Sequence, residues 1–92
     1  MSSLSITLAD LTDGAATFTV TRTQPGTDRD PVVWVHVDDT SDDPAQQDDA
    51  PVQWGTNASL TGTATLPVVG HGRAYATGTP WRVRRSDPSV EF

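Results

Sequence analysis

The chain contains no cysteine and no lysine, and it is short of large apolar residues. Without cysteine there are no disulfides, thiolate metal sites or cysteine nucleophiles, so the fold must be held together by packing alone. Leu, Ile, Val and Phe make up 18 of the 92 residues, which is close to the lower limit for a charged chain that folds. We therefore expect one compact domain with a thin core.

Long apolar runs and a secretion signal are also absent. The first ten residues, MSSLSITLAD, contain neither a basic segment nor an apolar segment of signal-peptide length. No stretch is apolar for long enough to form a membrane-spanning helix. We expect a protein made in the cytoplasm without a signal peptide.

The charge is strongly acidic and unusual in kind. The net charge is -6, eleven of the 12 acidic residues are Asp, and all six basic residues are Arg. This bias is typical of salt-loving archaea and their viruses, where hydrated carboxylates keep proteins soluble although the Debye length falls to about 3 Å near molar salt. A high-GC genome is the alternative source of the bias. Nucleic-acid binding is disfavoured because it needs clustered cations.

The first half of the chain predicts three strands. LSITLAD (4–10) and ATFTVTR (16–22) alternate apolar and polar residues, as half-buried strands do. The Asp13-Gly14 pair between them predicts a hairpin. VVWVHVD (32–38) is rich in β-branched residues and predicts the central strand of a sheet.

The second half combines an acidic loop with short strands. Residues 38–51, DDTSDDPAQQDDAP, contain six Asp, two Pro and no large apolar side chain, so they predict an exposed loop. Short strands are predicted at 52–54, 57–69, 73–77 and 81–85.

One face of the 57–69 segment carries small and apolar residues, namely Leu60, Gly62, Ala64 and Leu66. We expect this face to point into the core. Because a glycine inside a strand marks a bulge or a close backbone contact, Gly62 predicts one of these features.

Short strands without any 3.6-residue period predict an all-β fold, a compact antiparallel sandwich of about seven strands. A small β-barrel is the alternative. In strand number and size the chain resembles immunoglobulin-like or fibronectin-like modules, in which a tyrosine such as Tyr75 often lies late in the sequence. Residues 1–85 are expected to form the single β domain, and 86–92 (SDPSVEF) a C-terminal arm.

The sequence offers little catalytic chemistry. Only His36 and His71 could act as general bases, and the chain lacks the G-x-S-x-G pattern of a strained nucleophile turn. The paired aspartates of the 38–51 loop do not follow the order of a calcium loop, so a solvated loop is favoured over a cation site. We expect no enzymatic activity, no cofactor and no metal.

Three tryptophans and a cluster of arginines are the candidates for partner binding. Trp34 is expected in the core, whereas Trp54 and Trp81 follow loop residues and could serve as surface anchors. Packing at the rim of the core is the alternative for both tryptophans, and an arginine-rich edge that blocks aggregation is the alternative for the cluster. The predicted interface consists of Trp54, Trp81, Arg82, Arg84, Arg85, Val90 and Phe92.

In overall character the chain is similar to the small all-β decoration (cement) or accessory structural proteins of tailed viruses, in particular viruses of halophilic archaea. It shares with them its shortness and its Thr-rich and Gly-rich β pattern. The resemblance implies a virion protein present in many copies, often in trimeric clusters, bound to the major capsid protein through one end and a terminal arm. The partners expected are virion proteins and further copies of the chain, not nucleic acid or membrane. The alternative is an adhesion or ligand-binding module.

The acidic composition generates a prediction about salt. We expect a folded, β-rich homo-oligomer in multimolar KCl and loss of assembly at low salt, because the carboxylates repel one another until they are screened. Sedimentation analysis and circular dichroism on the same samples measure this. A stable monomer that is indifferent to salt would contradict the halophilic interpretation and favour the ligand-binding module.

Overall fold

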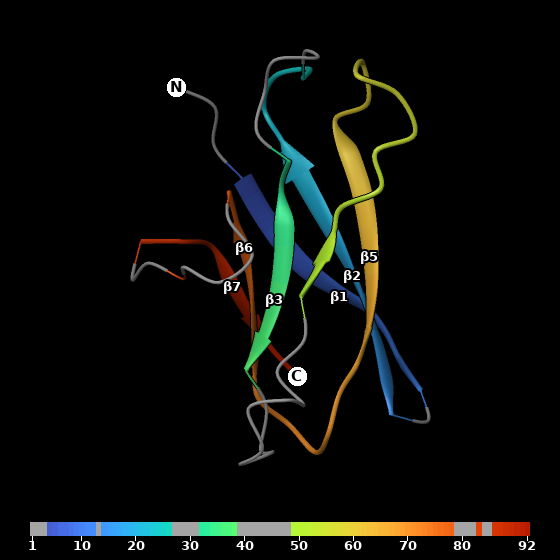
Figure 1. The fold of residues 1–92 in the computed structure, drawn as a ribbon, viewed down its shortest axis with the longest axis vertical. Helices are drawn as coiled ribbons and strands as arrows, with labels where there is room; N and C mark the ends of the chain where they lie inside the picture. The colour runs from blue at the N-terminus through green and yellow to red at the C-terminus, as the bar shows by residue number, and fades with distance from the viewer. Residues whose placement is uncertain (1–3, 13, 27–31, 39–48, 79–82, 84–85) are drawn as a thin grey trace.

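In the computed structural model the chain is a sandwich of two antiparallel β-sheets (Figure 1). The structure describes residues 4–12, 14–26, 32–38, 49–78, 83 and 86–92. One sheet has three strands in the order β1-β2-β5, and the other has four in the order β4-β3-β6-β7. Over these residues all regular structure is strand, so the prediction of a seven-stranded sandwich is confirmed and the closed barrel is not formed.

The strands β1 (Leu4–Thr12) and β2 (Ala15–Arg22) form the predicted hairpin. Thr12 pairs with Ala15, and Gly14 between them has a φ of 79°, a backbone region that glycine enters without a steric cost. The Asp13-Gly14 pair was therefore the right signal for the turn.

A β-bulge at Ala9 interrupts the pairing of β1 with β2. Leu8 pairs with Phe18, whereas Asp10 pairs with the next residue along, Thr17, so Ala9 is the extra residue. In a regular strand Asp10 would lie on the same face as Leu8. The bulge shifts the alternation by one position, which turns Asp10 to solvent and places Leu11 opposite the buried Ala16.

The prediction of a central strand at 32–38 is confirmed by β3 (Trp34–Asp38), which pairs with β4 on one side and with β6 (Arg73–Thr77) on the other. Val35 and Val37 are fully buried, while Trp34 lies on the opposite face and is only half-buried. The expectation that Trp34 belongs to the core is therefore wrong, because only one face of β3 meets the other sheet.

Strand β5 (Thr61–Pro67) is shorter than the segment predicted at 57–69. Its buried residues are the expected Gly62, Ala64 and Leu66. Leu60, also expected to point inward, is 44% exposed because it lies before the strand begins. The short strand predicted at 52–54 is reduced to one bridge between Gln53 and Thr63.

The last residues of the 38–51 segment are not loop. Residues Asp49–Pro51 form strand β4 and pair with the first three residues of β3. The rest of that segment, 39–48, lies outside the described residues, as do residues 81, 82, 84 and 85 of the strand predicted at 81–85, and Val83 between them is not in a strand.

The C-terminal residues belong to the sandwich and not to a separate arm. Strand β7 (Ser89–Glu91) pairs with β6, placing Val90 opposite the buried Ala74. The Phe92 ring meets the buried Phe18 ring edge-on, with centroids 5.9 Å apart. The expectation of an arm is therefore wrong for residues 89–92, because their apolar side chains complete the core of this same chain.

The core between the sheets is built from small side chains. Phe18 and Leu66 are the largest fully buried residues in the described part of the chain. Half-buried residues from both sheets and the C-terminus pack around this cluster. The buried apolar residues are Ile6, Ala16, Phe18, Val20, Val35, Val37, Val52, Ala64, Leu66, Val68, Ala74 and Ala76.

Gly62 on β5 lies in close contact with the segment that follows β4. A Cβ atom at Gly62 would lie 2.5 Å from Val52 Cγ1, 2.7 Å from Trp54 Cε3 and 2.9 Å from the backbone oxygen of Gln53. Of the two features predicted for Gly62, the close contact is observed, and the bulge occurs at Ala9 instead.

We predict that Gly62→Ala lowers the free energy of unfolding by about 1–3 kcal/mol, because the added methyl group overpacks this contact and one of its neighbours is rigid backbone. Gly78→Ala is the matched control, since a Cβ atom there meets nothing within 4 Å. Urea denaturation followed by circular dichroism compares the two variants. Equal stability of both would show that the contact at Gly62 is not tight.

Candidate functional site

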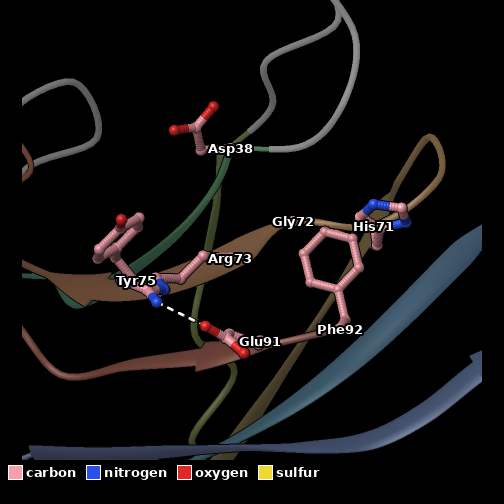
Figure 2. Close-up of a pocket in the computed structure, with 7 residues that line it drawn as sticks. All are labelled: Asp38, His71, Gly72, Arg73, Tyr75, Glu91 and Phe92. Atoms are coloured by element: carbon pink, nitrogen blue, oxygen red, sulfur yellow. Dashed lines mark hydrogen bonds and ion pairs between the residues drawn. The ribbon is translucent and has the colours of Figure 1, made fainter.

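An open depression of about 520 Å³ lies at one end of the four-stranded sheet. Its walls come from the ends of β3, β6 and β7 and from the turn before β6 (Figure 2). The side chains around it combine charged groups with two aromatic rings. The lining residues are Asp38, His71, Gly72, Arg73, Tyr75, Glu91 and Phe92.

Sheet register brings the charged residues of this depression together. Arg73 lies opposite Asp38 on β3 and opposite Glu91 on β7. Its Nη2 donates to Glu91 Oε1 over 2.6 Å, an exposed ion pair drawn in Figure 2. A side-chain hydrogen bond to Glu91, followed by one to Tyr75, raises the pKa of Arg73 above its ordinary value.

The aromatic part of the depression is held by the backbone. Gly72 and Phe92 exchange two hydrogen bonds, from each amide to the other carbonyl, at 3.1 and 3.0 Å. Phe92 thus contributes to the core through Phe18 and to the wall of the depression. The site offers carboxylates, one guanidinium and ring surfaces, which are groups for recognising a polar ligand or a partner side chain.

The two histidines lie in different surroundings. His71 is exposed in the turn before β6, and His36 is half-buried on the outer face of β3. The Nδ1 atom of His36 is buried without a hydrogen-bond partner. Among the described residues, no group of three or more His, Asp or Glu side chains is arranged to hold a metal ion.

Trp54 packs at the rim of the core instead of standing free on the surface. The Arg22 guanidinium lies over its ring at 4.0 Å from the centroid, and Gly62 lies against its Cε3 edge. Arg22 Nε donates to the Ser59 carbonyl at 2.7 Å, and Nη2 donates to the Asn57 carbonyl at 3.0 Å. This cluster fastens the 52–60 segment to the end of β2.

The other predicted interface residues divide into two groups. Val90 and Phe92 pack against the core, so they are not the unpaired docking residues that the sequence suggested. The remaining four lie outside the described residues, and their role stays a prediction. They are Trp81, Arg82, Arg84 and Arg85.

Exposed apolar residues occur at both ends of the sandwich. Leu11 and Val69 lie near the β1–β2 turn, where the Val68 amide donates to the Gly14 carbonyl. Val32 and Leu60 lie at the opposite end, where strands β3 and β5 begin (Figure 1). All four side chains are between 44% and 54% exposed.

Sequence reasoning missed the depression because its charged residues come from three strands that are distant in the chain. Of the residues that line the depression, only His71 stands out in the sequence, because its position between two glycines indicates a turn. The Asp38–Arg73–Glu91 row depends on the register of three strands. No spacing within the sequence encodes that register.

Comparison with known proteins returns no matching family model, no matching curated protein and no matching solved structure. Within the described residues no helix is long and apolar enough to cross a membrane.

We predict that Arg22→Lys lowers the free energy of unfolding by about 1–2 kcal/mol, because lysine cannot donate to two carbonyls and stack on the Trp54 ring at once. Arg73→Lys is the control, since Arg73 is exposed and pairs at the surface. Thermal melting and tryptophan emission give the comparison. An Arg22→Lys variant as stable as the control would mean that the cluster does not fasten the 52–60 segment.

Proposed function

We propose that this protein is a non-enzymatic structural protein of a virion, which decorates the surface of a capsid or tail and stabilises the particle by binding neighbouring proteins. The proposal is supported by the acidic, lysine-free composition and by the compact sandwich. It is also supported by the resemblance in character to small decoration proteins.

The observation that carries the proposal is the contrast between the small core and the apolar residues left outside it. Among the described residues the core consists mostly of alanine and valine, while Leu11, Val32, Leu60 and Val69 remain exposed at the two ends. A domain with so little buried apolar volume is marginally stable by itself. Binding a partner through an apolar end would stabilise the folded state by mass action.

The C-terminal strand changes how such binding would occur. Since residues 89–92 complete the sandwich, they are not available to reach a neighbouring molecule without opening the core. We therefore place the contact with the particle at one end of the sandwich, where the exposed apolar residues lie.

A ligand-binding or adhesion module is the second candidate, and the depression beside Arg73 favours it. Its volume of about 520 Å³ falls within the range of small-molecule sites. Its lining, with Asp38, Glu91 and Arg73, suits a polar ligand.

We predict that the protein copurifies with virus particles from the source that encodes it, in many copies per particle. Mass spectrometry of gradient-purified particles measures the copy number.

Two double variants locate the contact, L11N/V69N at one end and V32N/L60N at the other. We expect one of them to lower incorporation about tenfold, since a buried amide would replace an apolar contact.

The variant T63N/T65N is the control, because Thr63 and Thr65 are exposed in the middle of strand β5 and neither adjoins any of the four apolar residues in the sequence. It should be incorporated like the wild type. Absence of the protein from purified particles would overturn the virion role and leave the ligand-binding module. Normal incorporation of both end variants would overturn the end-on contact.

A further inference from the structure

The four sheet edges differ sharply in how well they are protected. Strand β4 is three residues long and contains Asp49 and Pro51, and β7 is equally short and carries Glu91. The edge of β5 is covered at Thr63, which exchanges two backbone hydrogen bonds with Gln53. Charge, proline, shortness and covering are the usual protections of a sheet edge.

Strand β1 is the longest of the four edge strands and has no such cover from the described residues. It is nine residues long, and among the described residues only β2 pairs with it. Residues 4–9, Leu-Ser-Ile-Thr-Leu-Ala, contain neither charge nor proline. In a chain of net charge -6, this edge is therefore uncharged over residues 4–9, and no described strand pairs with its outer side.

The pairing with β2 determines which backbone groups of β1 point to its outer edge. The Arg22 amide donates to the Leu60 carbonyl, so Arg22 directs its backbone groups away from β1. Its cross-strand partner Leu4 therefore directs its own amide and carbonyl to the open edge. Because this direction alternates along a strand, Ile6 and Leu8 share it.

The pattern of these residues is symmetric about Ile6. Reading outward from Ile6 in either direction gives a hydroxyl residue, Ser5 or Thr7, and then a leucine, Leu4 or Leu8. Two such strands, antiparallel about a two-fold axis at Ile6, would place Leu4 opposite Leu8 and Ser5 opposite Thr7. Apolar side chains would meet on the inner face and hydroxyls on the outer face.

The backbone groups fit the same arrangement. Residues whose amide and carbonyl face each other across an antiparallel pair exchange both hydrogen bonds. Ile6 would do so with Ile6 of the second copy, and Leu4 with Leu8. The bulge at Ala9 ends the regular edge, so it limits the ladder to residues 4–8 and fixes the register.

We propose that the open edge of β1 binds the same edge of a second copy of this chain, joining two three-stranded sheets into one continuous antiparallel sheet. The contact is isologous, as a two-fold axis requires. It also covers Leu4 and Leu8, which are only half-buried in the single chain. This inference does not rest on a role in the virion, because it follows from the edge alone.

A charge-swap experiment tests the register directly. In the proposed pairing Ser5 lies opposite Thr7, so S5K/T7K and S5D/T7D each place like charges face to face, which destabilises a cross-strand pair. We expect each variant alone to dimerise about tenfold more weakly than the wild type. An equimolar mixture should form heterodimers. Sedimentation over a concentration series measures the dissociation constants, in the lowest KCl concentration at which circular dichroism shows folded protein, so that the introduced charges are screened as little as possible.

The control variant T61K/T63K carries the same added charge on the far strand of the same sheet, and it should dimerise like the wild type. If a double variant fails to fold, a mixture of Thr7→Lys and Ser5→Asp tests the same pair of positions. A wild type that stays monomeric, or a trimer as the smallest assembly, would overturn the proposal. So would an S5K/T7K variant that assembles as well as the control.

The outcome is separable from that of the virion proposal. Dimerisation is measured on purified protein without particles, whereas the virion role is measured by copurification with particles. A dimer absent from particles would retain the edge contact and reject the virion role. A monomer that is incorporated into particles would reject the edge contact and retain the virion role.

Discussion

The small volume of the core is the constraint on which the rest of the structure depends. Nine of the twelve buried apolar residues in the described part of the chain are Ala or Val, so the two sheets must lie close together to fill the space between them. Gly62 on β5 lies so close to residues 52–54 that a methyl group there would clash with Val52 and Trp54. The same constraint keeps Trp54 at the rim, where the Arg22 guanidinium covers the face of the indole ring.

Local patterns predicted the parts of the fold that depend on neighbouring residues. Alternation identified the inward face of β2, and Asp13-Gly14 identified the hairpin. The C-terminal strand could not be predicted in this way, because SDPSVEF has too few apolar residues to indicate a strand by itself. It forms β7 because Val90 meets Ala74 and Phe92 meets Phe18, contacts that only the folded chain provides. The depression beside Arg73 was missed for the same reason.

The bulge at Ala9 shows how much one residue can determine. It turns Asp10 to solvent, so that no carboxylate enters a core too small to hydrate it. It also brings Leu11 to the inward side near the end of the hairpin, where Leu11 stays exposed. The bulge therefore keeps Asp10 out of the core but leaves Leu11 partly exposed in the single chain.

Charge and self-association are linked through where the acidic residues lie. A chain of net charge -6 repels its copies, and that repulsion is strongest where carboxylates would approach one another. On the open edge of β1 the first acidic residue is Asp10, beyond the bulge and on the outer face. A contact through residues 4–8 would therefore bring together uncharged segments of two acidic molecules. Added salt would then screen the remaining long-range repulsion while leaving the apolar and backbone contacts intact.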